Sequence, residues 1–177
     1  MNIECVDFSR VERMIAGLVG EPCMRKEVGE YKSLSLGFGP EEVPNKVPAA
    51  RIYRTWELRT YRSSWRIVRG GFVICGHRDL GDNAEFNITL GSIDLGKFAS
   101  LRQLNDLDIR IELDNGVKVD FLSTFSDDDE LISIFCPGNS IIEYSVRHGW
   151  ITGPSDKPWI RSTHDCVDNP DLDQNMK

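Results

Sequence analysis

The densest group of side chains able to do chemistry is a run of four acids, Asp127, Asp128, Asp129 and Glu130. Carboxylates bind hard cations such as calcium, but calcium loops alternate acids with other residues so that the ligands point inward. This run lacks that alternation, and a solvated turn is the simpler interpretation. Adjacent like charges also attract cationic groups, so we expect residues 127–130 to form an anionic patch for a basic partner.

A second candidate is His77, which is followed by Arg78 and Asp79 at the end of a predicted strand. An imidazole oriented by a carboxylate can act as a general acid or base. Residues 77 and 79 share a face of an extended chain, yet no Ser or Cys nucleophile accompanies them at a suitable spacing. We therefore expect a structural turn in which Asp79 hydrogen-bonds the backbone, with a small hydrolase that uses His77 and Asp79 as an alternative.

The other His and Cys residues have no spacing typical of a metal or redox site. His148 and His164 are isolated, and the five cysteines, at positions 5, 23, 75, 136 and 166, include no Cys-x-x-Cys pair. No glycine-rich phosphate loop lies between a strand and a helix. We expect reduced, mostly buried thiols, and no metal or other cofactor.

Two of the four tryptophans, Trp150 and Trp159, lie near a stretch rich in Gly and Pro towards the C-terminal end. Trp is enriched in protein interfaces because it combines a large apolar ring with a polar N–H. Both residues are therefore candidates for a binding surface, with simple packing in the core as the alternative.

Charge narrows the classes of partner. The chain of 177 residues has 21 basic and 28 acidic side chains, which gives a net charge of −7 at pH 7. A field of this sign repels phosphates and anionic lipids, so we expect no nucleic acid and no membrane as partner, whereas a basic protein would be attracted. The alternative is that this charge merely keeps a small domain soluble.

The elements that position these residues begin with a helix. Ser9 and Glu12 have the spacing of a capping box, which predicts a helix that starts at Ser9. An apolar stripe at helical spacing follows, formed by Val11, Met14, Ile15 and Leu18. The stripe indicates a short helix that packs on a core.

Strands follow, because apolar residues then recur at every second position. We expect strands at 33–38, ended by Gly39-Pro40, and at 51–62, with Trp56 and Leu58 facing inward. Three hairpins are predicted at 65–75, 109–121 and 131–146. The first has Gly70-Gly71 as its turn and pairs Val68 with Val73 and Ile67 with Ile74.

The hairpin at 109–121 has the strongest local pattern. A three-residue loop at 114–116 opposes Ile109 to Phe121 and Ile111 to Val119, so that the apolar side chains share one face. This loop requires a left-handed backbone at Gly116.

These patterns predict an α+β fold that is mostly β. We expect an antiparallel sheet of consecutive hairpins, as a sandwich or a partly closed barrel, in one globular domain over residues 1–164 with a short N-terminal helix. Residues 165–177 form a polar tail that cannot bury enough surface to become ordered. The first twenty residues hold three acids and no long apolar run, so we expect a cytoplasmic protein.

Two segments resemble a group of small bacterial proteins. They are the run Trp65 to Gly76 with Asp79, and the run Asp108 to Val117. Over residues 51–146 these strand and turn patterns are similar to immunity proteins of polymorphic toxin and contact-dependent growth inhibition systems. The resemblance implies a protein that binds the toxin domain of its own system and blocks its active site, and it carries over no catalytic residue. Such toxins are frequently basic nucleases, which the acidic charge would suit.

Besides the hydrolase that uses His77 and Asp79, a third hypothesis is a β-barrel that binds a small ligand. Such a barrel requires a large apolar void. An interior filled by large side chains would exclude it, namely by Trp56, Trp65, Ile111, Val119 and Phe121.

Overall fold

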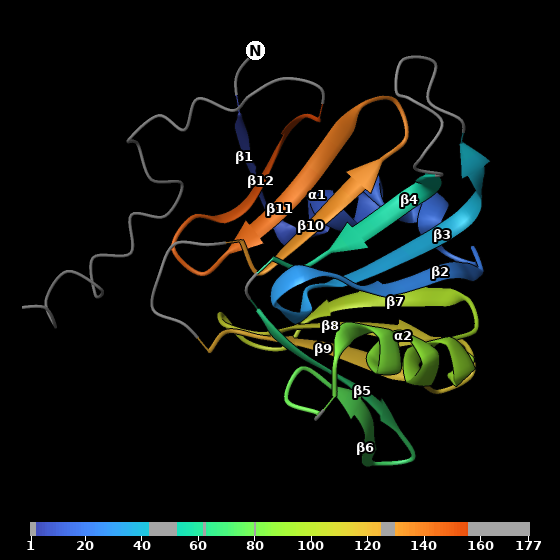
Figure 1. Cartoon of the computed structure of the whole chain (residues 1–177). Helices are drawn as coiled ribbons and strands as arrows, with labels where there is room; N and C mark the ends of the chain where they lie inside the picture. Colours follow the sequence, from blue (N-terminus) through green and yellow to red (C-terminus); the bar gives the residue numbers. More distant parts are fainter. Residues whose placement is uncertain (1–2, 43–52, 62, 80, 125–129, 156–177) are drawn as a thin grey trace, which may run out of the picture.

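The computed structural model describes residues 3–42, 53–61, 63–79, 81–124 and 130–155. Within them, two antiparallel sheets and two α-helices form an α+β fold that is mostly β, as predicted (Figure 1). The seven-stranded sheet has the order β1 (Glu4–Val6), β12 (Gly149–Pro154), β11 (Ser140–Ser145), β10 (Ile132–Cys136), β4 (Tyr53–Arg59), β3 (Leu34–Glu42) and β2 (Cys23–Val28). The five-stranded sheet has the order β6 (Phe72–Gly76), β5 (Ser64–Arg69), β9 (Lys118–Leu122), β8 (Ile109–Leu113) and β7 (Phe98–Gln103).

The two sheets are joined where β2 approaches β7. An isolated bridge connects Pro22 with Lys97, and the backbone N–H of Cys23 donates to the carbonyl of Gly96 at 2.9 Å. The N–H of Phe98 donates to the carbonyl of Glu21, also at 2.9 Å. The segment before β2 therefore carries the hydrogen bonding of one sheet into the other.

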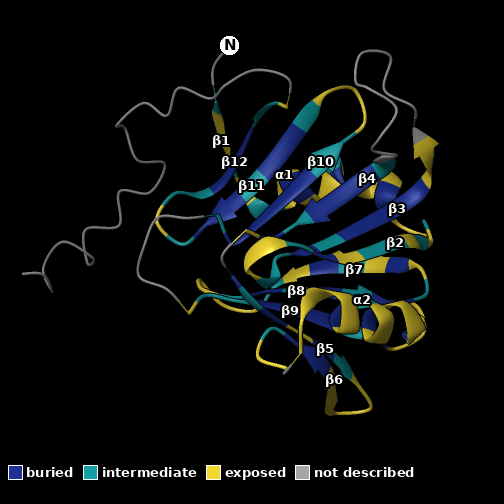
Figure 2. Cartoon of the chain, viewed as in Figure 1, coloured by how far each residue is buried: buried dark blue, intermediate teal, exposed yellow. Residues whose placement is uncertain are grey.

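A single apolar core lies between the sheets. Phe38 of β3 meets Phe98 of β7 edge to face, with ring centroids 5.8 Å apart. Large side chains fill this core, including Trp56, Trp65, Ile111, Val119 and Phe121. Figure 2 shows the buried residues along the strands of both sheets. The interior is packed with side chains, which counts against a ligand-filled barrel.

The N-terminal helix α1 (Phe8–Met14) exists, but its cap differs from the prediction. Asp7 is the N-cap residue, and its carboxylate accepts from the N–H of Arg10 at 2.7 Å and from the hydroxyl of Ser9 at 2.8 Å. The carboxylate takes the capping position ahead of the Ser9 hydroxyl because it is the stronger acceptor. A 3₁₀-helix (Ala16–Leu18) follows, and Val11, Ile15 and Leu18 are buried, as the stripe predicts.

The helix α2 (Asn83–Ser92) was not predicted. Asp82 caps its N-terminus by accepting from the N–H groups of Ala84 and Glu85. Of its side chains only Phe86 and Leu90 are buried, so the sequence lacks a continuous apolar stripe. A 3₁₀-helix (Glu30–Lys32) precedes β3.

The three predicted hairpins are confirmed, with one correction of register. In the hairpin of β8 and β9, Ile109 pairs with Phe121 and Ile111 with Val119, and Gly116 has a φ of 79°. In the hairpin of β5 and β6, Ile67 pairs with Cys75 instead of Ile74, because the register shifts by one residue next to Val68. The third hairpin joins β10 to β11 in the expected place.

Other strand expectations were incomplete. The strand β3 continues to Glu42, beyond Gly39-Pro40, because a register shift against β4 absorbs the irregularity. The strands β1, β2, β7 and β12 were not predicted. The polar tail at 165–177 lies outside the described residues.

The cysteines follow the prediction only in part. Cys23, Cys75 and Cys136 are free thiols, and of these Cys75 is buried. Cys5 is disulfide-bonded, so the expectation of a reduced thiol is wrong for this residue.

The left-handed turn at Gly116 gives a test of the fold. A Cβ at Gly116 would meet no neighbour within 4 Å, so Gly116→Ala should cost only backbone strain, about 1 kcal/mol in the free energy of unfolding. Gly91 in α2 is equally open but has an ordinary helical backbone, and Gly91→Ala should raise that free energy by roughly 0.5 kcal/mol. Urea denaturation followed by circular dichroism measures both. Equal effects of the two substitutions would contradict the assigned turn.

Candidate functional site: a groove on the outer face of the seven-stranded sheet

The outer face of the seven-stranded sheet is set by the alternation of side chains along its strands. Leu34, Leu36 and Phe38 of β3 face the core, as do Trp56 and Leu58 of β4. The residues between them face away from the core. In register across the sheet these outward residues form a row: Glu27 of β2, Ser35 of β3, Arg59 of β4, Ser133 of β10 and Glu143 of β11.

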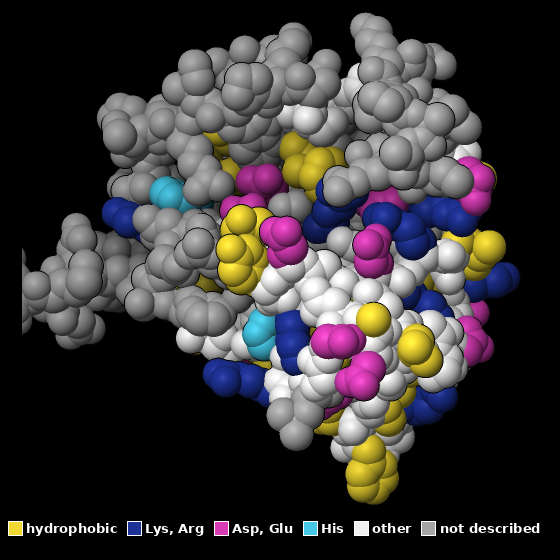
Figure 3. Space-filling view, in the orientation of Figure 1, with side chains coloured by type: hydrophobic (Ala, Val, Ile, Leu, Met, Phe, Trp, Pro, Cys, Tyr) yellow, Lys and Arg dark blue, Asp and Glu magenta, His cyan; other side chains and the backbone are white. Residues whose placement is uncertain are grey.

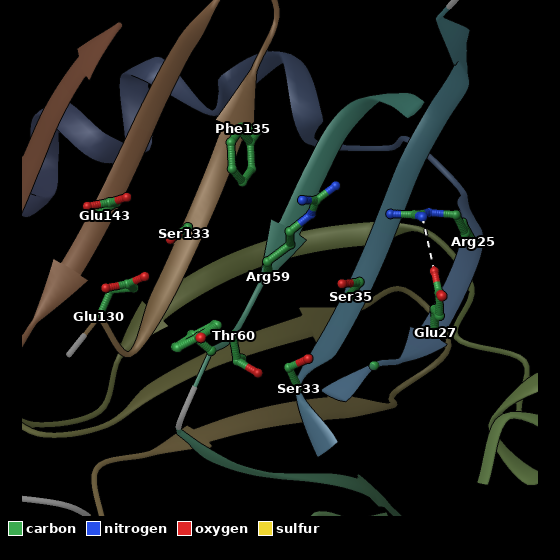
Figure 4. Close-up of a pocket in the computed structure, with 12 residues that line it drawn as sticks. Arg25, Glu27, Ser33, Ser35, Arg59, Thr60, Glu130, Ser133, Phe135 and Glu143 are labelled. Atoms are coloured by element: carbon green, nitrogen blue, oxygen red, sulfur yellow. Dashed lines mark hydrogen bonds and ion pairs between the residues drawn. The ribbon is translucent and has the colours of Figure 1, made fainter. Parts of the chain in front are cut away.

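This row lines a groove with a volume of about 710 Å³ (Figure 4). The row crosses five neighbouring strands, and at about 4.8 Å per strand its two glutamates stand roughly 19 Å apart. The serines on either side of Arg59 have small side chains, so the surface of the sheet is hollowed next to the arginine. The groove is also lined by Arg25 of β2, and by residues at or near strand ends and in the adjacent turns: Gly29, Ser33, Thr60, Tyr61, Glu130 and Phe135.

A second row of residues lies beside the first and reaches the groove through Arg25. Arg25 of β2, Gly37 of β3 and Glu57 of β4 are in register. A Cβ at Gly37 would come within 3.1 Å of the Arg25 Cβ and 2.7 Å of the Arg54 Cγ. Because Gly37 has no side chain, the Arg25 guanidinium reaches across β3 and forms an ion pair with Glu57.

Glu57 is the most buried charge of this second row, with a residue exposure of 2%. One carboxylate oxygen pairs with Arg25 and lies 3.8 Å from Arg59, and the other accepts from the N–H of Arg54 at 3.0 Å. A buried carboxylate is tolerated when its oxygens are satisfied in this way. Glu57 therefore fixes where the arginines stand.

Charges alternate along the groove. The Arg59 guanidinium lies over the Phe135 ring, 5.0 Å from its centroid, and divides the row between Glu27 and Glu143. The lining residues include two arginines and three glutamates, a net charge of 2 − 3 = −1. A surface of this kind suits a partner with cationic groups at both ends and an acceptor in the middle.

One member of the predicted acidic patch lies in this groove. Glu130 is among the lining residues. Asp127, Asp128 and Asp129 lie outside the described residues, as does Trp159. The structure therefore places only Glu130 of this patch, together with Glu143.

Trp150 is part of the core and not of the groove. Its exposure is 5%, its ring lies 4.7 Å from that of Tyr144 and 5.8 Å from that of Phe8, and its indole N–H donates to Gln103. Trp150 was a candidate either for a binding surface or for packing in the core, and its surroundings are those of a core residue.

His77 and Asp79 lie in one turn, and within the described residues no hydrogen bond or ion pair joins their side chains. The Asp79 carboxylate accepts from the N–H of Gly76 at 2.9 Å, which is the expected backbone contact. Burial, together with Arg78, lowers the pKa of His77. Its buried Nδ1 has no hydrogen-bond partner among the described residues. The carboxylate therefore does not orient the imidazole for acid–base work.

The free thiols are poor nucleophiles. Burial raises the pKa of Cys23 to about 12, and the pKa values of Cys75 and Cys136 to about 11. Near neutral pH these groups are almost entirely protonated, whereas nucleophilic cysteines need a lowered pKa.

Sequence reasoning missed most of the groove. Alternation along the strand at 51–62 places Glu57 and Arg59 on the face away from the inward Trp56 and Leu58. This alternation is the signal by which the two outward residues could have been found. Glu27 and Arg25 lie on β2, which was not predicted, and their meeting with β4 depends on the strand order.

Comparisons with known proteins give no relative. No family model matches the chain, and neither the curated proteins nor the solved structures contain a significant match. Among the described residues, no three His, Cys, Asp or Glu side chains gather in a way that suits a metal ion. No helix in that part of the chain has the length and apolar character needed to cross a membrane.

The role of Glu57 can be tested by comparing two glutamates that share one arginine. Glu57→Gln should lower the free energy of unfolding by about 3 kcal/mol, because Arg25 and Arg59 lose a buried counter-charge. Glu27 also pairs with Arg25, at 3.2 Å, but its side chain is 56% exposed. Glu27→Gln should therefore cost less than about 1 kcal/mol. Chemical denaturation of both variants measures this, and a cost for Glu57→Gln as small as that for Glu27→Gln would refute the assigned role.

Proposed function

We propose that this protein is a bacterial immunity protein, which binds the toxin of its own system in a one-to-one complex through the groove. The observation that carries the proposal is the groove itself, a concave face with glutamates at both ends of one row. The net charge of −7 adds attraction for a basic toxin, and the resemblance over residues 51–146 supports the assignment to this class.

The row suggests how the partner is held. Cationic side chains of the toxin pair with Glu27 at one end of the groove and with Glu143 and Glu130 at the other. Between them Arg59 receives a carboxylate or carbonyl group of the toxin, while the Phe135 ring offers an apolar contact. Charge pairs at such a site favour fast and selective association.

The candidate nucleophiles and bases lack the partners and the pKa values that catalysis requires, which supports a binding role over a catalytic one. The imidazole of His77 has no carboxylate partner among the described residues, and the pKa values of the three free thiols are raised. The proposed mechanism is therefore occlusion of the toxin, with no turnover.

The proposed compartment is the cytoplasm, where an immunity protein meets a toxin that has entered the cell. The three free cysteines fit a reducing compartment. The disulfide at Cys5 fits it less well, because disulfides are rare there.

The test is capture of the partner from the cytoplasmic fraction of the native cells with tagged protein, at low and at moderate salt. We expect one basic protein in near-equal amount. Glu27→Lys or Glu143→Lys should weaken its binding about tenfold, which corresponds to ~1.4 kcal/mol, because each places a like charge against the toxin.

Glu12→Lys is the matched control. It makes the same change of charge at an exposed position of α1, away from the groove, and should leave binding within about twofold. Equal weakening by all three variants would show that only the overall charge matters. Absence of any stoichiometric partner at either salt concentration would overturn the proposal.

A further inference from the structure

The edge strand β6 exposes three consecutive apolar residues. Phe72 is 76% exposed, Val73 57% and Ile74 37%. The strand pairs with β5 on one side and is the last strand of its sheet. Figure 3 shows hydrophobic side chains projecting at the lower end of the molecule, where Figure 1 places β6.

Two of the other sheet edges in the described chain, β2 and β7, are covered. The side chain of Asn87 in α2 forms the two hydrogen bonds that a residue of a neighbouring strand would form with β2. Its Oδ1 accepts from the N–H of Val28 at 2.7 Å, and its Nδ2 donates to the carbonyl of Val28 at 3.0 Å. Lys26 of β2 donates to the carbonyl of Ile93 at 2.6 Å. The edge strand β7 is joined to the segment before β2.

The remaining edges differ in character. The strand β1 is three residues long, and its Glu4 forms an ion pair with Arg10. Short and charged edge strands resist pairing with other chains. By contrast, residues Phe72 to Gly76 contain neither a charge nor a proline. The N–H and the carbonyl of Gly76 are both hydrogen-bonded to Asp79, and the register against β5 shifts at Ile74, so an added strand would pair at the Phe72 end of β6.

Arginines surround this edge in a chain that is acidic overall. Arg66 and Arg69 of β5 and Arg78 after β6 are all exposed. Asp120, itself fully buried, holds Arg66 at 2.8 Å, and Arg69 donates to the carbonyl of Asp94. Two acids also lie beside Cys75 of β6, namely Asp79, which accepts from the N–H of Gly76, and Glu85 of α2.

The positive charge of these arginines determines which kind of strand can pair with β6. Antiparallel pairing of β6 with β6 of a second copy would bring Arg78 of one copy towards the turn that follows Arg69 of the other, and like charges would oppose the dimer. A strand with acidic residues at its ends would instead be attracted by the same arginines.

We propose that β6 is a β-augmentation site, which accepts an extended apolar segment with acidic flanks from a partner protein. The added strand continues the five-stranded sheet through backbone hydrogen bonds, and its apolar side chains cover Phe72 and Val73. This site is independent of the groove, which lies on the other sheet and prefers basic groups.

The probe is a synthetic peptide of sequence EEVTVTVEE, with KKVTVTVKK as its charge-reversed control. We expect the acidic peptide to shift the backbone amide NMR signals of β6 and to bind at least about tenfold more tightly than the basic one. Phe72→Asp and Val73→Asp should each weaken its binding about tenfold. Because both residues are exposed, the variants should retain the wild-type circular dichroism spectrum.

Ile88→Asp is the matched control, since Ile88 is also 76% exposed but lies on α2. It should bind the acidic peptide as the wild-type protein does. Shifts that spare β6, equal binding of the two peptides, or equal weakening by Ile88→Asp would overturn the proposal. Light scattering of the protein alone should give a monomer; a dimer broken by Phe72→Asp but not by Ile88→Asp would assign the edge to a second copy instead.

Discussion

The packing of the two sheets against each other is the interaction on which the rest of the structure depends. Trp56, Leu58 and Phe38 of one sheet and Trp65, Phe98 and Phe121 of the other belong to one buried cluster. Burying side chains of this size contributes about 1.5–3 kcal/mol each, against the entropy lost on ordering the backbone. Each strand must therefore turn its apolar residues to the same side.

The functional face is a consequence of that constraint. Once Leu36, Leu58 and Ile134 face the core, their neighbours Ser35, Arg59 and Ser133 must face outward. Strand pairing then brings these neighbours into register. The missing side chain at Gly37 adds the contact between Arg25 and Glu57, which places a fixed charge pair beneath the surface.

Local signals made the hairpins predictable. In each, a turn lies between two alternating runs close in sequence, as in Ile109 to Phe121 around Gly116. The strand β2 escaped prediction because Lys26, at an inward position, is polar and reaches the carbonyls of α2. The helix α2 escaped because it buries only two side chains.

The candidate site was less predictable for a related reason. Glu130 was recognisable as part of an acidic run, but Glu27, Arg59 and Glu143 come from three strands that lie far apart in sequence. Their meeting depends on the order β11-β10-β4-β3-β2, in which β4 pairs with β10 more than seventy residues later. No local pattern encodes this order, since it follows from how the hairpins assemble.

Binding of a protein partner in the groove can be tested directly by carboxylate footprinting. Carbodiimide-driven labelling, read by mass spectrometry, is compared for the protein alone and for its complex with the captured partner. We expect reduced labelling of Glu27 and Glu143 in the complex, with Glu12 on α1 unchanged. Unchanged labelling of Glu27 and Glu143 in a stoichiometric complex would contradict it and would place the partner on another face.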